Sequence, residues 1–365
     1  MNIKKMSRFA IMAALSLGLT ACGAGSNEGA NTEEAASTPA ENASTEAADT
    51  KETSSSGDSK KIAVLLYNGS DTYIASVRQA LEKIDEADDT VELVFQDGQN
   101  NQGTQTDQIN NITAQGVDGI LLNIVDISAA PTVMDTIKAS GIPTTFFNRD
   151  MTESLSEEDL DNFMFIGTNA PEAGVMQGEM ITKLWEEGKM DRNGNGVLDY
   201  VMLNGGLDNP EAQARTEYSV KTIEEAGIEV NEVAFQDAKW STDQAKTAMD
   251  TWLQTNQDNI DAVISNNDDM AIGAISALQS VGLNTGSSED NMVVVGVDAT
   301  DLAVAEIDKG TMSGTVKQDA EGMAKALIDT MKNKLENGDF VEGSDYELAE
   351  DNKSIRINYQ VYTGK

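Results

Sequence analysis

The feature that most constrains the fold of this 365-residue chain is a regular alternation of two kinds of segment, which begins near residue 60. Short apolar runs such as 60–67 (KKIAVLLY) and 119–125 (GILLNIV) are typical of strands that are buried on both faces. Longer segments between them carry apolar residues at helical spacing, as Val77, Leu81 and Ile84 do. Strands that alternate with helices predict an α/β fold, in which parallel sheets are covered by helices on both faces.

The same pattern places the individual elements, and the chain is long enough for one large or two ordinary domains. The predicted strands are 60–67, 91–95, 119–125, 144–147, 163–166, 199–203, 230–235, 262–265, 292–297 and 355–361. The predicted helices are one that carries Val77 to Ile84, followed by 105–115, 130–140, 173–187, 210–226, 242–255, 270–280, 302–308 and 320–336.

The first residues are typical of a processing signal and not of a folded segment. Basic residues up to Arg8 precede an apolar run, 9–19, that is too short for a stable membrane-spanning anchor. A small residue stands just before Cys22, the only cysteine of the chain, and this arrangement resembles a bacterial lipoprotein signal. The resemblance implies a signal peptide over 1–21 and a lipid anchor on Cys22. An ordinary secretory signal with an incidental cysteine is the alternative.

Composition predicts a tether after this signal and excludes several function classes. Residues 22–59 lack core-forming side chains, so we expect a disordered acidic tether there, with the acylated cysteine at its start. The net charge of −37 repels nucleic acid, so we expect no nucleic-acid partner. The chain has no histidine, which excludes Ser-His-Asp and Cys-His nucleophiles and histidine-ligated zinc.

The run 191–199 (DRNGNGVLD) has the spacing of a loop that surrounds a hard cation such as Ca²⁺ with oxygen atoms. Position 12 of a helix-loop-helix calcium hand is a bidentate Glu, but here it is Met202, so the last carboxylate must come from elsewhere. A polar turn without metal is the alternative. The candidate ligands within the run are Asp191, Asn193, Asn195, the carbonyl of Val197, and Asp199, and Gly196 permits the sharp turn.

Polar residues gather where predicted strands end. In doubly wound sheets, ligands bind beyond the carboxyl ends of the strands, so this recurrence predicts a cleft. Each residue taken alone could instead be a helix cap or a turn residue. The residues are Asp71, Asn123, 148–150, 266–268 and Asp298.

The residue types in this cleft suit a sugar. Planar Asn, Asp and Arg side chains can each hold two adjacent hydroxyls, and an aromatic side chain can cover the apolar face of a sugar ring. Tyr73 and Trp240 are the candidate aromatic residues, because neither falls in an apolar stripe. The alternative for each is a partly buried packing residue.

Several of these motifs, in this order, resemble the sugar-binding lipoproteins of ABC importers that have the type I periplasmic-binding-protein fold, and in particular the galactose/glucose-binding branch. The resemblance covers about residues 61–361. The motifs that carry it are IAVLLYNGSDTY (62–73), LNIVD (122–126), FFNRD (146–150), DRNGNGVLD (191–199), NPEAQAR (209–215), AKW (238–240), ISNNDDMAIGA (264–274) and VVGVDAT (294–300).

The family fold implies two doubly wound parallel-sheet lobes joined by a three-strand hinge. We expect an N-terminal lobe of 60–142 plus 317–353. The C-terminal lobe would then comprise 143–316 plus 354–365 and include the calcium loop. The family supplies the distant calcium carboxylate from a Glu, and Asp261 is the matching residue here.

The resemblance also implies a hexose site, carried over residue by residue. Three of its positions depart from the family pattern: Asn209 stands where His is usual, Glu211 where Asp is usual, and Gln318 where Asn is usual. These departures leave the identity of the sugar open. The other implied substrate-binding residues are Asp71, Tyr73, Asn123, Arg215, Trp240, Asn267 and Asp298.

The implied function is binding and not catalysis. The chain would be a monomeric, lipid-anchored protein outside the cytoplasm that closes on D-galactose or D-glucose and delivers it to a membrane permease, with a chemoreceptor as a further candidate partner. A pentose or a sugar-like signal is the alternative ligand. A secreted glycoside hydrolase would need two opposed carboxylates, and no such pair stands out. A sugar-responsive repressor is disfavoured by the export signal and the acidic charge.

Overall fold

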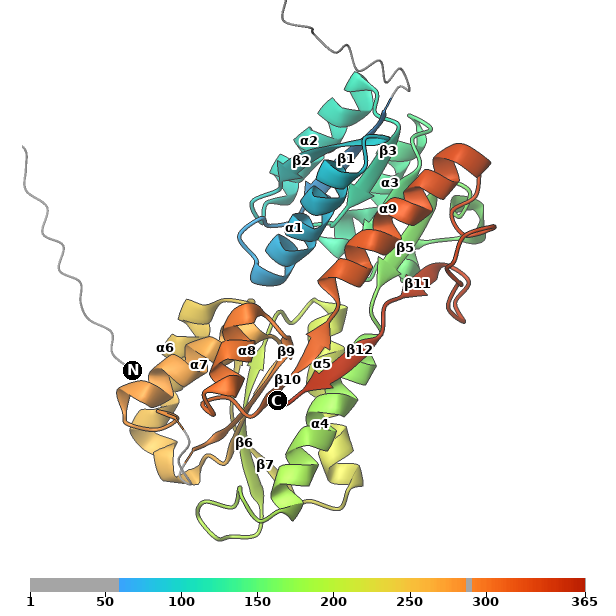
Figure 1. Cartoon of the computed structure of the whole chain (residues 1–365). Helices are drawn as coiled ribbons and strands as arrows, with labels where there is room; N and C mark the ends of the chain where they lie inside the picture. The colour runs from blue at the N-terminus through green and yellow to red at the C-terminus, as the bar shows by residue number, and fades with distance from the viewer. Residues whose placement is uncertain (1–58, 287–290, 365) are drawn as a thin grey trace, which may run out of the picture. The chain divides into compact units, whose positions relative to one another are not determined.

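The computed structural model describes residues 59–286 and 291–364, which form two α/β lobes (Figure 1). The predicted signal peptide, Cys22 and all of the predicted tether except Ser59 lie outside the described residues. Within the described ranges, no helix is both long enough and apolar enough to cross a membrane.

The first lobe is built on a six-stranded parallel sheet. Its strand order, β11-β5-β4-β3-β1-β2, places the reversal of winding direction between β1 and β3. These strands read as continuous apolar runs because helices cover both faces, and residues 62–66 of β1 are fully buried. The strands are β1 (Lys60–Leu66), β2 (Val91–Asp97), β3 (Gly119–Leu122), β4 (Thr144–Phe147), β5 (Phe163–Gly167) and β11 (Ser354–Arg356).

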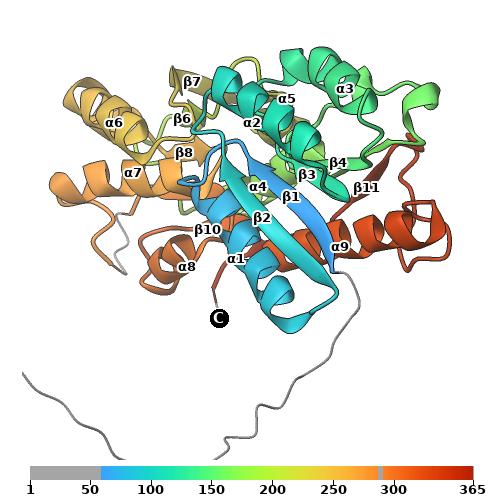
Figure 2. The same cartoon turned by 90° about the horizontal axis from the view of Figure 1, so that it is seen from above.

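Two apolar clusters hold the helices of this lobe against the sheet, one on each face. One cluster joins the sheet to α1 (Thr72–Ala87) and α9 (Ala320–Asn337), and the other joins it to α2 (Gln102–Gln115) and α3 (Ala130–Lys138). The view from above shows these two helix layers on opposite sides of the strands (Figure 2). Short 3₁₀ turns occur at Ile127–Ala129, Thr152–Ser154 and Glu157–Asp159.

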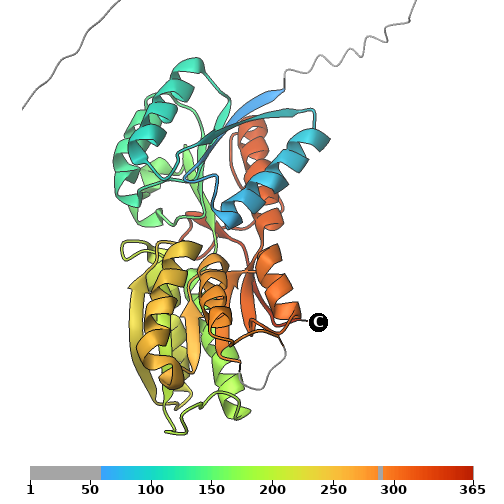
Figure 3. The same ribbon diagram turned by 90° about the vertical axis from the view of Figure 1, so that its left-hand side faces the viewer.

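The second lobe repeats this plan with the sheet order β12-β10-β9-β8-β6-β7. Only β12 runs antiparallel, against β10. Helices α4 and α5 pack on one face and α6, α7 and α8 on the other (Figure 3). The strands are β6 (Leu198–Asn204), β7 (Val230–Asp237), β8 (Ala262–Ser265), β9 (Val293–Asp298), β10 (Gly314–Gln318) and β12 (Tyr359–Tyr362). The helices are α4 (Ala170–Glu186), α5 (Pro210–Glu225), α6 (Thr242–Asn256), α7 (Asp268–Ser280) and α8 (Asp301–Asp308), with a 3₁₀ turn at Gln257–Asn259.

The described part of the chain crosses between the lobes three times, so the predicted fold class, two doubly wound lobes with a three-segment hinge, is confirmed. The predicted lobe boundaries need correction. Strands β4 and β5 pair within the first sheet, so the first crossover lies at 168–169 and not at 142–143. The second crossover lies between β10 and α9, and the third at 357–358, because β11 also pairs with β5.

Two strand predictions were also wrong in detail. The run 355–361 was predicted as one strand, but its two ends pair with different sheets, as β11 and β12. Strand β10 was missed altogether. These errors share a cause, since both segments belong to the crossovers, where pairing partners are set by the tertiary fold.

Candidate ligand-binding site

The candidate site lies between the lobes, where the carboxyl ends of both sheets meet. A cleft of about 700 Å³ leads to a small inner cavity of about 40 Å³. The inner cavity has room for roughly one water molecule, so a sugar requires the lobes or side chains to move apart. It is lined by Tyr67, Asp71, Tyr73, Asn148, Arg149, Asn209, Glu211, Arg215, Trp240, Asn267, Asp298 and Gln318.

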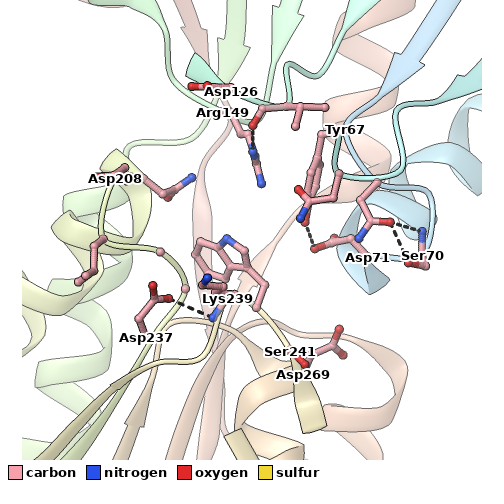
Figure 4. Close-up of a pocket in the computed structure, with 18 of the residues that line it drawn as sticks. Tyr67, Ser70, Asp71, Asp126, Arg149, Asp208, Asp237, Lys239, Ser241 and Asp269 are labelled. Atoms are coloured by element: carbon pink, nitrogen blue, oxygen red, sulfur yellow. Dashed lines mark hydrogen bonds between the residues drawn. The ribbon is translucent and has the colours of Figure 1, made fainter. Parts of the chain in front are cut away.

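The first lobe contributes an interlocked polar wall. Asp71 caps α1 by accepting the Ile74 N–H at 2.9 Å, and its other oxygen accepts the Tyr67 hydroxyl at 2.5 Å. The guanidinium of Arg149 lies 3.7 Å from the centre of the Tyr67 ring, which is a cation–π contact, and donates to the carbonyl of Val125. Figure 4 shows Tyr67, Asp71 and Arg149 on the first lobe's side of the cleft.

Arg215 organises the second lobe's wall from inside α5. Its Nη1 donates to the Asn266 carbonyl at 2.8 Å, and its Nη2 donates to Gln318 Oε1 at 2.8 Å and to the Tyr359 hydroxyl at 3.0 Å. Burial alone would lower the pKa of Arg215, but Tyr359 and Asp298 raise it above its ordinary value. The side chain therefore presents a buried, permanent positive charge at the cavity.

Asp298 provides a buried acidic group at the end of β9. Burial raises the pKa of Asp298 well above its usual range; Arg215 opposes this shift, and the nearby carboxylates of Asp268 and Asp71 add to it. Burial also raises the pKa of Asp268, to about 7, although its oxygens accept hydrogen bonds from Thr315 and Thr300. The cavity thus has an excess of buried acidic groups over its one buried arginine.

Three buried polar atoms of the lining have no hydrogen-bond partner: the Tyr73 hydroxyl, Glu211 Oε2 and Arg215 Nε. Their residues are 6%, 7% and 3% exposed, so water does not replace the missing partners easily. A buried donor or acceptor left unsatisfied costs about 1–3 kcal/mol. The cavity therefore favours a ligand that offers both donors and acceptors.

Several loops of the site hold residues at positive φ, a conformation that costs a non-glycine residue about 1–3 kcal/mol and is concentrated at functional sites. Asn148 has a φ of 65°, Trp240 of 60° and Asp298 of 125°. Each lies at or just beyond the carboxyl end of a strand.

Nine of the ten residues predicted to bind the substrate line the inner cavity. Three of them, Asp71, Asn209 and Asn267, also cap helices α1, α5 and α7. These three side chains therefore both cap a helix and line the cavity. The exception is Asn123, which is fully buried and does not line the cavity. Its amide donates to the carbonyl of Phe147 and to Asn148 Oδ1, so in this conformation it supports a lining residue from behind.

The prediction missed three lining residues: Tyr67, Asn148 and Arg149. All three directly follow strands β1 and β4. Asn148 and Arg149 were counted among the polar residues at strand ends but were not assigned to the site. Consistent use of the strand-end rule would have included them.

The predicted calcium loop lies at the far end of the second lobe, before β6. Asp199 is 4% exposed, and its Oδ2 accepts the side-chain amides of Asn193 and Asn195 at 2.8 and 2.9 Å. The two amide groups thus present nitrogen, not oxygen, to Asp199. Asp191 accepts backbone N–H groups of the loop, from Asn195 at 3.1 Å and from residue 196 at 3.0 Å.

Asp261, the proposed distant ligand, lies directly beside this loop. Its Oδ1 accepts the Arg192 N–H at 2.8 Å and its Oδ2 accepts the Asp199 N–H at 2.9 Å. Burial raises the pKa of Asp261, and the charges of Asp199 and Asp191 add to this shift. The described part of the chain contains no group of three or more His, Cys, Asp or Glu side chains arranged to hold a metal. The donor set is nevertheless oxygen-rich and acidic, which suits Ca²⁺.

Comparison with known proteins identifies similar sequences over most of the chain. The profile of the family described as "Periplasmic binding protein domain" matches residues 62–339. The D-galactose/methyl-galactoside binding periplasmic protein MglB of Haemophilus influenzae is 31% identical over 301 residues, which are 82% of this chain and 88% of the relative. A protein of Rhizobium meliloti with the provisional name of rhizopine-binding protein is 35% identical over 292 residues, 78% of this chain and 84% of the relative.

Solved structures of the same architecture are also similar. An ABC transporter solute binding protein of Bacillus halodurans with bound myo-inositol superimposes with a TM-score of 0.68 at 28% identity, over 83% of this chain and 94% of that chain. A glucose-galactose binding protein of Geobacillus stearothermophilus, GanP, has a TM-score of 0.66 at 16% identity and covers 84% of this chain and 98% of that chain. At that identity the second likeness concerns the fold alone.

Proposed function

Because the chain belongs to the periplasmic binding protein domain family, we propose that it is the extracytoplasmic sugar-binding component of an ABC importer and that its ligand is an aldohexose, D-galactose or D-glucose. The family resemblance inferred from the sequence motifs is confirmed, and the chain is a binding protein, not an enzyme. In the proposed cycle, the two lobes close on the sugar and the closed protein delivers it to a membrane permease.

The observation that carries the proposal is the set of unpartnered atoms on Tyr73, Glu211 and Arg215 in one buried cavity. A hexose hydroxyl is both a donor and an acceptor, so neighbouring hydroxyls can satisfy a guanidinium N–H and a carboxylate oxygen together. Trp240 lines the same cavity and offers an apolar face to the C–H side of a sugar ring. A cyclitol is the second candidate ligand, because it presents a similar ring of hydroxyls and a relative of known structure holds myo-inositol.

Isothermal titration calorimetry with D-galactose, D-glucose, D-ribose and myo-inositol tests this proposal. We expect saturable binding of at least one aldohexose, with a change in tryptophan fluorescence because Trp240 lines the cavity. Tighter binding of ribose or myo-inositol than of either hexose would contradict the assignment of a hexose ligand. It would still agree with a binding protein for sugars or related polyols. No response to any of the four would contradict sugar binding.

The lipid anchor of the protein is proposed on the sequence alone. Acylation of Cys22 would anchor the chain to the outer face of the cell membrane, with 22–59 as the tether that lets the lobes reach the permease. Mass spectrometry of the mature N-terminal peptide tests this, since a free Cys22 thiol would contradict it. A chemoreceptor remains a second proposed partner of the closed form.

We also propose a structural Ca²⁺ in the second lobe, held by loop 191–199 and Asp261. The support is chemical: the charges of Asp199 and Asp191 act on the nearby Asp261 carboxylate, and Asn193 and Asn195 can supply amide oxygens once their side chains turn from Asp199. The ion would neutralise these neighbouring carboxylates and fix the loop before β6.

A further inference from the structure

Glu211 has two carboxylate oxygens in different situations. Oε1 accepts the backbone N–H of Asp150 at 2.6 Å, whereas Oε2 is buried without a partner. Glu211 belongs to α5 of the second lobe, and Asp150 lies in the loop after β4 of the first lobe. One side chain therefore spans the two lobes at the inner cavity and retains a free acceptor there.

The first-lobe partner of Glu211 is itself tied to the hinge. Asp150 Oδ2 accepts Nη1 of Arg356 at 2.6 Å, and the same nitrogen donates to the carbonyl of Thr168 at 3.0 Å. Arg356 ends β11, where the third crossover begins, and Thr168 belongs to the first crossover. A continuous polar path thus leads from the cavity through Glu211 and Asp150 to two of the hinge segments.

We propose that Glu211 couples ligand binding to lobe closure, because a ligand hydroxyl on Oε2 would position the same carboxylate that holds Asp150 and, through Arg356, the hinge. This inference rests on the proposed sugar-binding function and adds a positioning role to one residue of the site. The path has charged groups at Glu211, Asp150 and Arg356, and charge-assisted hydrogen bonds are the stronger kind.

The length of the glutamate side chain is central to this role. Its carboxylate must contact Asp150 across the lobe gap and also reach the cavity, and an aspartate is one carbon–carbon bond, about 1.5 Å, shorter. Glu211→Asp should therefore lose the contact with Asp150. Asp150→Asn keeps the backbone N–H for Glu211 and one side-chain oxygen for Thr152, and it replaces the oxygen that accepts Arg356. Glu217→Asp is a matched control, since Glu217 is an exposed residue of the same helix, α5.

Hydrogen exchange of the Asp150 amide, with galactose titration of the full chain, tests the proposal. In the wild type we expect galactose to slow exchange of the peptides that carry Asp150 and Thr168. In Glu211→Asp the ligand-free exchange of Asp150 should rise about tenfold, galactose affinity should fall about tenfold, and galactose should no longer protect either peptide. In Asp150→Asn, galactose should still protect the Asp150 amide but not the Thr168 peptide.

Two outcomes separate the failure of this inference from the failure of the proposed function. If the wild type binds no hexose, the proposed function is contradicted. The ligand-free exchange rate of the Asp150 amide in Glu211→Asp then tests only the hydrogen bond between Glu211 and Asp150. A Glu211→Asp variant in which galactose still protects both peptides, as it should in Glu217→Asp, contradicts the coupling even if affinity falls.

Discussion

Trp240 depends on a single glycine for its place in the site wall. A Cβ atom at Gly205, which directly follows β6, would lie 2.3 Å from the Trp240 ring, and no real Cβ contact is that short. Gly205 is buried and its neighbour Gly206 is half-buried. At Gly206, a Cβ would meet only Asn209 at 3.5 Å, which is an ordinary contact. The Trp240 ring therefore requires a glycine at position 205 but not at position 206.

We therefore expect Gly205→Ala to displace the Trp240 ring and to weaken galactose binding about tenfold, with a destabilisation of about 1–3 kcal/mol. Calorimetric titration and urea unfolding followed by tryptophan fluorescence measure the two effects. Gly206→Ala is the control and should bind galactose as the wild type does. Equal affinity in the two variants would show that the ring position does not matter for the ligand.

At the scale of single residues, the sequence predicted which residue types would line the site, but not which hydrogen bonds they would form. Asp71 and Asp298 were found because polar residues at strand ends converge in a doubly wound fold, whereas Arg215, inside α5, was implied by the family resemblance alone. That Asn123 is buried behind Asn148 depends on side-chain packing that no spacing reveals. The Glu211 contact with Asp150 likewise joins residues 61 positions apart across a lobe boundary that the sequence placed incorrectly.

At the level of elements, prediction succeeded where a segment's own pattern decides its structure. Strand β1 and helix α9 were found almost to the residue, because one is a continuous apolar run and the other has a long amphipathic stripe. Strand β10 failed because its five residues, GTVKQ, include a single large apolar side chain, Val316. It is a strand because β9 and β12 pair with it on either side.

The proposed role of loop 191–199 as a calcium site can be tested by removing the ion. If Ca²⁺ binds there, it binds the folded state only, so saturating calcium should raise the melting temperature by several degrees relative to a chelator. Asp191→Ala should abolish this calcium-dependent difference. Asp258→Ala, outside the proposed ligand set, is the control and should retain it. Identical melting of the wild type in calcium and in chelator would leave the loop as a polar turn without metal.

At the scale of the whole described molecule, the three crossovers are joined to one another and to the cavity. Tyr359 of β12 lies 2.6 Å from the Thr168 hydroxyl and accepts Arg215 Nη2, which also donates to Gln318 at the end of β10. On the other side of the cleft, Thr72 of α1 donates to Asp269 of α7 at 2.7 Å. Lobe movement therefore has to rearrange polar contacts on both sides of the ligand site, which is how binding energy can be converted into closure.

The charge of the chain also acts at this scale. The net charge of the chain is −37. The cleft mouth also has more acidic than basic groups, with six carboxylates and two basic side chains, Arg149 and Lys239. Figure 4 shows that acidic residues come from both sides of the opening. The six are Asp71, Asp126, Asp208, Asp237, Asp243 and Asp269. A cleft lined by one sign of charge lowers the local concentration of ligands of the same sign.

We therefore expect D-galacturonate and D-galactose 6-phosphate to bind at least about tenfold more weakly than D-galactose at low ionic strength. The difference should shrink in 1 M salt, where the screening length falls from about 10 Å at 0.1 M to about 3 Å. Replacing two of the three exposed mouth carboxylates, by Asp208→Asn with Asp243→Asn, should improve galacturonate binding and leave galactose unchanged. Asp345→Asn with Glu347→Gln removes the same charge outside the cleft and should change neither. Salt-independent rejection of the anions would mean that close fit in the cavity, and not the charge of the mouth, excludes them.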